Sequence, residues 1–291
     1  MNVPLTPIRF LYRARDQFGR KVGIVDEPLS WTYQQYYERC VQLANLLLSW
    51  NLKPSSRVAF LSYNTHYLLE AYYGVLLAQG IFIPLNIRLN PSDFRFILND
   101  CQAEFLFFHP DFLPTIKHIL PDLPGVRKFI SLEPCAETDW VETDHCDILL
   151  SKESKELAFD VLAVDENATA ELFYTSGTTD QPKGVMLTHR NLYLHALETA
   201  IAVEAKETDV RLHTIPLFHV NGWGTPQFLT CVGGRHVMLK KFSPEEVLQQ
   251  IERQKVSVFS LVPSMATALL NYKNLKKYNV SSVKKIFLGG S

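Results

Sequence analysis

The sequence lacks the features that mark secreted, zinc-binding and membrane-spanning proteins. Its five cysteines are scattered, with no CxxC pair and no zinc-like spacing with histidine, which predicts reduced thiols. The first sixteen residues carry three arginines but no apolar run after them, which excludes a secretory signal. The longest nearly apolar stretch, residues 71–84, is too short to cross a bilayer and contains Gln79 and Gly80. We therefore expect a soluble, cytoplasmic enzyme.

The chain also lacks a charge excess of either sign, internal repeats and low-complexity tracts. A formal net charge of −1 provides no overall field that would attract nucleic acid or an anionic membrane, so we expect neither as a partner. A hydrophobic content of 47% argues against disorder, and 291 residues can form about two domains. Any charged ligand must therefore be bound by local groups.

Strand-like and helix-like segments alternate along most of the chain, which is typical of an α/β fold with largely parallel sheets. Three helix starts are predicted by capping residues and prolines, at Thr32 with Gln35, Asn90 with Pro91, and Ser243 with Pro244. Strands are predicted at residues 22–25, 58–61, 81–83, 105–108, 128–131, 170–174, 235–239, 256–261 and 286–288. The acidic segment 133–166 predicts a solvated connection with a small helix near residues 148–154.

The ten residues from Thr175 to Gly184 contain four side-chain hydroxyls, two glycines and Lys183. They follow the predicted strand at 170–174, and residues 185–200 have helical spacing. The loop is therefore predicted at a helix N-terminus, where unpaired N–H groups face outward. Glycines let such a backbone approach a phosphate, hydroxyls donate hydrogen bonds, and a lysine adds positive charge. The segment predicts a site for a polyanion.

The loop has two alternative interpretations. The Walker A spacing fails, because Pro182 stands where glycine is required and Gly184 follows the lysine where serine or threonine should bind Mg²⁺. A polar turn whose hydroxyls bind their own backbone is the alternative for a short Thr-Ser-Gly sequence. The composition of the whole run favours phosphate binding.

Taken together with other segments, the loop resembles the Ser/Thr/Gly signature of the AMP-forming acyl-CoA synthetases, within the adenylate-forming enzymes. Trp31-Thr32-Tyr33, Arg57-Val58-Ala59, residues 83–89 and residues 215–223 resemble further motifs of that family, in the expected order. The loop departs from the pattern at Asp180 and Gln181, because the corresponding stretch in the family usually begins with glycine. The carboxylate of Asp180 adds negative charge close to where a triphosphate should lie.

The resemblance implies a fold of two stacked, largely parallel sheets with helices between and outside them. It implies one sheet subdomain at about residues 65–180 and a second formed by residues 1–64 with 181–291. Family motifs expected after Ser291 are missing, as is a mobile C-terminal domain with a catalytic lysine. The sequence is thus expected to be a truncated N-terminal AMP-binding domain that is inactive by itself.

The resemblance further implies an acid:CoA ligase, which uses ATP to convert a carboxylic acid into an acyl adenylate and then into acyl-CoA, releasing pyrophosphate and AMP. ATP, CoA and the acid are the expected partners, with Mg²⁺ as cofactor. The pattern at residues 219–223 favours a medium- or long-chain fatty acid. An aryl or short-chain acid ligase, and a nucleotide-binding fragment without turnover, are the alternatives. A homodimer is left open.

The expected site residues follow from the same resemblance. A phosphate cradle is expected from Thr175, Ser176, Gly177, Thr178, Thr179 and Lys183, with Lys183 offsetting charge during catalysis and Thr178 as the candidate Mg²⁺ ligand. Gly289 and Gly290 resemble the start of a nucleotide-binding motif beside the adenine and acyl pocket. His219 is assigned to catalysis and to the acyl adenylate, and Trp223 to the pocket wall. Without the resemblance, a lone histidine in an apolar run predicts a hydrogen-bonded core residue.

Overall fold

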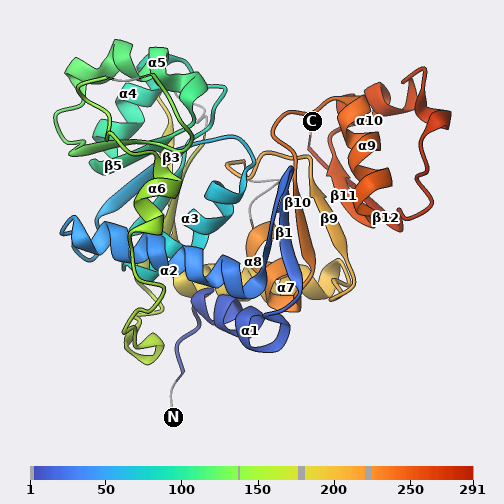
Figure 1. The fold of residues 1–291 in the computed structure, drawn as a ribbon, viewed down its shortest axis with the longest axis horizontal. Coiled ribbons are helices and arrows are strands. Elements are labelled where there is room, and N and C mark those ends of the chain that lie inside the picture. Colours follow the sequence, from blue (N-terminus) through green and yellow to red (C-terminus); the bar gives the residue numbers. More distant parts are fainter. Residues whose placement is uncertain (1–2, 137, 176–180, 220–223, 291) are drawn as a thin grey trace. The chain divides into compact units, whose positions relative to one another are not determined.

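The computed structural model describes residues 3–136, 138–175, 181–219 and 224–290, and Figure 1 shows its ribbon. The chain divides into two compact units. The first comprises residues 1–8, 38–63 and 67–192, and the second comprises residues 9–37, 64–66 and 193–291. Each unit contains one six-stranded sheet. Within the described part of the chain, no helix has the length and hydrophobicity needed to cross a bilayer.

The sheet of the first unit has the strand order β6-β5-β3-β4-β7-β8. Neighbouring strands from β6 to β7 are parallel, and β8 at the edge is antiparallel to β7. The strands are β3 (Arg57–Leu61), β4 (Ile81–Pro84), β5 (Ala103–Phe108), β6 (Lys128–Ser131), β7 (Thr169–Thr175) and β8 (Lys183–Thr188). Most of these strands are buried and apolar, as parallel strands covered on both faces must be.

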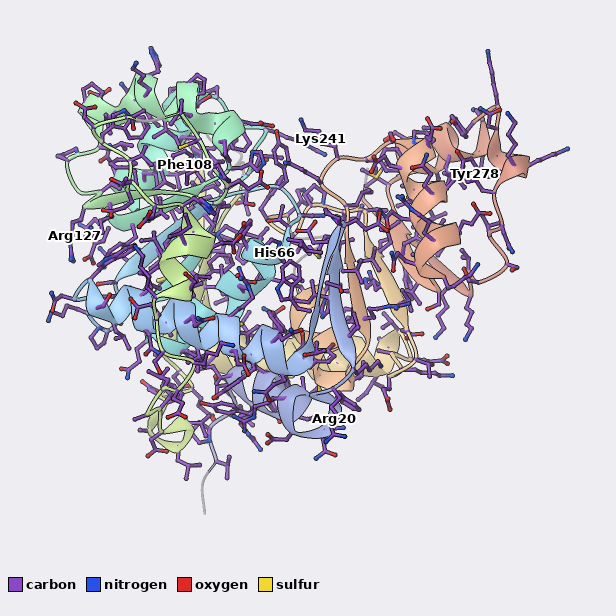
Figure 2. The ribbon with its side chains drawn as sticks, in the orientation of Figure 1. Arg20, His66, Phe108, Arg127, Lys241 and Tyr278 are labelled. Carbon is purple, nitrogen blue, oxygen red and sulfur yellow. The ribbon has the colours of Figure 1, made fainter. Side chains whose placement is uncertain are left out.

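Side chains that alternate along β5 pack on opposite faces of this sheet. Phe108, labelled in Figure 2, joins the apolar cluster formed with α4 and α5. On the other face Phe107 stacks on Phe60 at 4.5 Å between ring centroids, and Tyr72 of α3 meets Phe82 edge-on at 4.7 Å. The α-helices that lie wholly or mostly in this unit are α2 (Tyr33–Ser49), α3 (His66–Leu77), α4 (Pro91–Asp100), α5 (Leu113–Ile119) and α6 (Cys146–Ser151).

The sheet of the second unit has the order β12-β11-β9-β10-β1-β2. Its strands are β1 (Val22–Asp26), β2 (Leu29–Thr32), β9 (Val210–His213), β10 (Arg235–Met238), β11 (Val258–Leu261) and β12 (Lys285–Leu288). All neighbouring pairs are parallel except β1 and β2, which form an antiparallel hairpin. The carboxyl ends of β1, β9, β10, β11 and β12 therefore lie at one edge of the sheet.

Helices cover both faces of this second sheet. Side chains of α9 and α10 form one apolar cluster with β9, β10 and β11, and Phe228 of α8 belongs to another cluster with Phe10 of α1. Figure 1 shows α9 and α10 in orange and red beside β11 and β12. The α-helices lying wholly or mostly in this unit are α1 (Ile8–Phe18), α7 (His189–Ala202), α8 (Thr225–Val232), α9 (Pro244–Gln254) and α10 (Pro263–Leu270).

The predicted α/β class is confirmed, since both sheets are largely parallel and each carries one antiparallel edge strand. The three predicted helix starts are also confirmed. Thr32 and Gln35 exchange backbone-to-side-chain hydrogen bonds, Asn90 forms a capping box with Asp93, and the Ser243 hydroxyl accepts from the Glu246 N–H. The small helix expected near residues 148–154 is α6, which begins two residues earlier.

The helix predicted from Val185 onward is wrong in its first turn, because residues 183–188 form strand β8 and α7 begins only at His189. Pairing with β7 in six register positions satisfies the backbone of this segment. Thr188 and Asn191 then exchange hydrogen bonds that place the helix start after the strand. The ten-residue loop thus joins two antiparallel strands and does not lie at a helix N-terminus.

Strands β2 and β9 were also missed by the sequence analysis. β2 is a short, largely exposed edge strand with no apolar face to reveal it. β9 lies inside the sheet and is largely buried. Two of its four residues are the polar Arg211 and His213, so its sequence lacks the apolar run that predicts a buried strand.

The two units group residues differently from the expected subdomains. The expectation placed residues 1–64 and 181–291 together, whereas β3 lies between β4 and β5 in the first sheet and β8 pairs with β7 there. Strand pairing determines the grouping, because a strand joins the sheet that satisfies its backbone.

His189, the first residue of α7, is buried, and its Nδ1 lies 3.0 Å from the Thr6 hydroxyl. Burial lowers the pKa of His189 to about 4. Because the unfolded chain gains the proton first, we expect the unfolding free energy to fall as pH drops from about 6.5 toward 4, by up to about 1.4 kcal/mol per pH unit. Denaturant unfolding at several pH values should show a shallower acid slope in His189→Gln. Parallel pH curves for the two proteins would contradict this assignment.

Candidate functional site

The ends of the hydroxyl-rich loop lie opposite each other at the turn end of the β7–β8 hairpin in the first unit. Thr175 is the register partner of Lys183, and both are exposed. The expected phosphate-binding residues Ser176, Gly177, Thr178 and Thr179 lie outside the described residues. The described part of the loop thus places a threonine and a lysine opposite each other at the exposed end of the hairpin.

This hairpin geometry changes the physical basis of the predicted polyanion site. The N–H groups of a helix N-terminus are not available here, because α7 starts five residues after Gly184. Gly184 has a packing role: a Cβ there would lie 3.1 Å from Leu172 Cδ1 and 3.3 Å from the ring of Tyr174. Positive charge at the turn comes from Lys183, which leads into the edge strand.

His219 lies on the loop that follows the carboxyl end of β9 in the second unit. The His219 N–H donates to the Pro216 carbonyl at 3.1 Å, which closes a tight turn. Leu217 and Phe218 are buried and anchor the turn, whereas His219 is exposed. His219 is therefore not a core histidine, and its ring is accessible to a ligand at this edge of the sheet.

Asn64 holds this loop through three buried hydrogen bonds. Its amide nitrogen donates to the carbonyls of His213 at 2.8 Å and Ile215 at 3.0 Å, and its amide oxygen accepts from the Leu217 N–H at 2.9 Å. The side chain thus satisfies three backbone groups, one at the last residue of β9 and two in the irregular segment that follows it. Sequence analysis missed Asn64, although a polar residue soon after a buried strand is a known signal of a site.

A second polar group at the same edge was also missed. Asp26, the last residue of β1, accepts hydrogen bonds from the backbone N–H and the Nδ1 of His66, at 2.9 and 2.7 Å. The Trp31 ring stacks on His66 with 4.2 Å between ring centroids. Figure 2 labels His66. These contacts fix residues 64–66 beside the sheet and so support the position of Asn64.

Beneath the loop, a chain of buried polar side chains joins β9 to its neighbours. His213 Nε2 lies 3.0 Å from His236 Nδ1, and His236 Nε2 lies 3.1 Å from the Thr230 hydroxyl. Burial lowers the pKa of His213 and, helped by the charge of Arg211, lowers that of His236 to about 3. Both rings are neutral at ordinary pH and act as hydrogen-bonding parts of the core.

Gly289 and Gly290 follow β12 at the edge where the His219 loop also begins. The Gly289 N–H donates to the Leu261 carbonyl at 3.2 Å, which extends the pairing with β11. Gly290 has a φ of 81°, a conformation that favours glycine, and nothing within 4 Å would meet a Cβ on Gly289. The structure thus places His219, Gly289 and Gly290 at one sheet edge. Trp223 lies outside the described residues.

The described residues do not supply an evident metal site. Among them, no group of three His, Cys, Asp or Glu side chains is arranged to hold a metal ion. The predicted Mg²⁺ ligand Thr178 falls outside the described ranges. Its assignment as a Mg²⁺ ligand stays a prediction.

Comparison with known proteins gives matches along nearly the whole chain. The family model described as "AMP-binding enzyme" matches residues 11–291. A peroxisomal butyrate–CoA ligase, AAE11, of Arabidopsis thaliana is 30% identical over 306 residues, covering 100% of this chain and 52% of the relative. A long-chain-fatty-acid–CoA ligase of Thermus thermophilus is 30% identical over 289 residues, covering 97% and 52%. The chain spans about half the length of these curated relatives.

Solved structures share the fold. The anthranilate CoA ligase AuaEII in complex with anthranoyl-AMP superposes with a TM-score of 0.92 at 22% identity, covering 100% of this chain and 56% of that one. ATP-bound MatB from Rhodopseudomonas palustris gives 0.82 at 23% identity, covering 98% and 55%. The two sheets and their helices are therefore those of the N-terminal domain of adenylate-forming enzymes.

Proposed function

Since the chain belongs to the family of AMP-binding enzymes, we propose that the protein containing it is an acid:CoA ligase. The proposed enzyme joins a carboxylate to the α-phosphate of ATP with release of pyrophosphate. The thiol of CoA then displaces AMP from the acyl adenylate. The observation that carries the proposal is the β7–β8 hairpin, whose register places Lys183 opposite Thr175 at the exposed end of the hydroxyl-rich loop.

The first step brings two anions together, so the enzyme must offset charge and align the reacting groups. In this proposal Thr175 and Lys183 bind the β- and γ-phosphates, together with Ser176, Gly177, Thr178 and Thr179. His219 contacts the carboxylate and the acyl adenylate from an anchored, exposed turn. Gly289 and Gly290 line the nucleotide, where the absence of side chains permits close approach.

We propose a medium- or long-chain fatty acid as the substrate. The similar proteins include a butyrate, a benzoate and a long-chain-fatty-acid ligase, so an aryl or short-chain acid is the competing substrate class. Acid-dependent exchange between ATP and pyrophosphate, followed by CoA consumption, tests the proposal in the full-length protein. A panel of acids from acetate to palmitate, with benzoate, separates the substrate classes. Nucleotide binding without exchange for any acid would refute the ligase proposal.

Replacing His219 with alanine should separate chemistry from nucleotide binding. Because His219 is exposed on its turn and its neighbours anchor that turn, the variant is expected to fold. We expect acid-dependent exchange to fall by about 10-fold or more, because a positioned acid–base or charged group is lost. The affinity for ATP should change little. Isothermal titration with ATP measures the second quantity. Equal loss of both would assign His219 a structural role.

Cytoplasmic location and a homodimer remain predictions from the sequence.

We also propose that the 291 residues alone bind ATP weakly and do not catalyse the reaction. Isothermal titration with ATP tests the weak binding, and the exchange assay on this chain tests the lack of turnover. Thioester formation by the isolated chain would contradict that proposal.

A further inference from the structure

A pocket within the second unit contains none of the residues proposed to bind ATP or the acid. Its volume is about 580 Å³, and it is lined by the β1–β2 hairpin, the first residue of β10 and the last turn of α9. Val22, Pro28 and Leu29 supply apolar surface, and Arg235, Arg253 and Glu27 supply the charges. Leu29 is 51% exposed, so part of this apolar surface is accessible to solvent.

The carboxylate of Glu27 is already bound by three side-chain donors of α9. Arg253 Nη2 lies 2.9 Å from Glu27 Oε2. The side-chain amides of Gln250 and Gln254 donate to the same carboxylate at 3.0 and 2.7 Å. Arg253 and Glu27 therefore neutralise each other, and neither determines the net charge of the pocket.

Arg235 retains an unused donor, and no carboxylate among the described residues forms an ion pair with it. Its Nη2 donates to the Gln254 carbonyl at 2.8 Å, while its Nε is buried and has no hydrogen-bond partner among the described residues. Burial lowers the pKa of Arg235, but a guanidinium stays protonated at ordinary pH. The charged side chains that line the pocket are Arg235, Arg253 and Glu27, so the lining has a net positive charge.

We propose that this pocket binds a small organic anion, whose carboxylate or phosphate group accepts hydrogen bonds from Arg235 and whose apolar part lies on Val22, Pro28 and Leu29. The planar fork of a guanidinium matches such oxyanions, and a partly dehydrated charge favours them more strongly than an exposed one. The site is independent of the proposed ligase activity, since none of its residues is assigned to ATP or to the acid.

Phenyl phosphate and benzoate are suitable probes, because each combines one oxyanion with a compact apolar ring. In the ¹H–¹⁵N spectrum, the Arg235 Nε–H signal should shift saturably on titration with at least one of them, which identifies whether phosphate or carboxylate is preferred. Arg235→Gln should weaken binding by about tenfold or more, since a charge-assisted contact is lost. Arg95→Gln is the matched control. This substitution removes an exposed arginine of the first unit. The affinity of the variant for each probe should equal that of the parent protein.

An Arg235 signal unmoved by both probes would overturn the proposal, and this readout does not depend on any variant folding. Equal affinity of Arg235→Gln and the parent protein would do the same. Lys183→Met should keep the probe binding, whereas it should impair ATP-dependent exchange. Loss of the Arg235 shift in that variant would reassign the anion to the nucleotide site. Failure of the ligase assay alone leaves the anion site standing, so the two proposals fail separately.

Discussion

Replacing Lys183 with methionine is expected to lower ATP affinity and acid-dependent pyrophosphate exchange by about 10- to 100-fold. This corresponds to about 1.5 to 3 kcal/mol, the usual contribution of one charge-assisted contact. Methionine keeps most of the length of the side chain and removes only its charge and donors. Because Lys183 is exposed at the first position of an edge strand, the variant should retain the stability of the parent protein. Isothermal titration with ATP and the exchange assay measure the two effects.

Two controls distinguish charge at the loop from charge in general. Lys183→Arg keeps the positive charge and should recover part of the activity, although the guanidinium has a different shape. Lys53→Met removes an exposed lysine of the same unit that is remote from the hairpin in sequence, and it should be without effect. Unchanged ATP affinity in Lys183→Met would remove this residue from the proposed phosphate site.

Asn64→Ala is expected to produce the largest loss of stability among the substitutions considered. Asn64 is 5% exposed, so the variant leaves three buried backbone groups, the carbonyls of His213 and Ile215 and the N–H of Leu217, without their partner. Three lost hydrogen bonds of about 1 kcal/mol each predict a decrease of about 3 kcal/mol in unfolding free energy. The turn that carries His219 should also lose its fixed position, so exchange activity should fall further than stability alone explains.

Asn45→Ala provides a matched control for this prediction. Asn45 also donates from its amide to two carbonyls, those of Ser154 and Glu156 at 2.8 and 3.0 Å, but these groups are exposed to water. Its loss should cost less than about 1 kcal/mol, because water replaces the missing donor. Denaturant unfolding of both variants makes the comparison. Similar losses for Asn64→Ala and Asn45→Ala would show that Asn64 does not hold the loop.

Local signals explain why much of the fold was predictable. The caps at Thr32, Asn90 and Ser243 act within one helical turn, and the buried strands of the first sheet are short apolar runs between turn residues. The motif order along the chain likewise needs no tertiary information. These features depend on neighbouring residues, so a single sequence contains them in full.

The errors arose where another segment of the chain supplies the stabilising partner. Residues 183–188 have spacing compatible with a helix, but pairing with β7 makes them a strand. Arg211 and His213 interrupt the apolar pattern of β9, yet both are buried because Ser260 and His236 provide hydrogen bonds. Helical spacing and apolar periodicity describe one segment alone and cannot include such partners.

For this protein, the amino-acid sequence by itself determined the α/β class, the helix starts, the family and the loop that is the best candidate for binding phosphate. Tertiary structure alone decided that this loop closes a hairpin, that Asn64 anchors the turn of His219, and that Arg235 lies in a pocket whose lining carboxylate, Glu27, pairs with Arg253. The physical reason is the range of the interactions. Caps and periodicity act within a few residues, whereas Asn64 satisfies groups about 150 residues away, which become neighbours only in the folded chain.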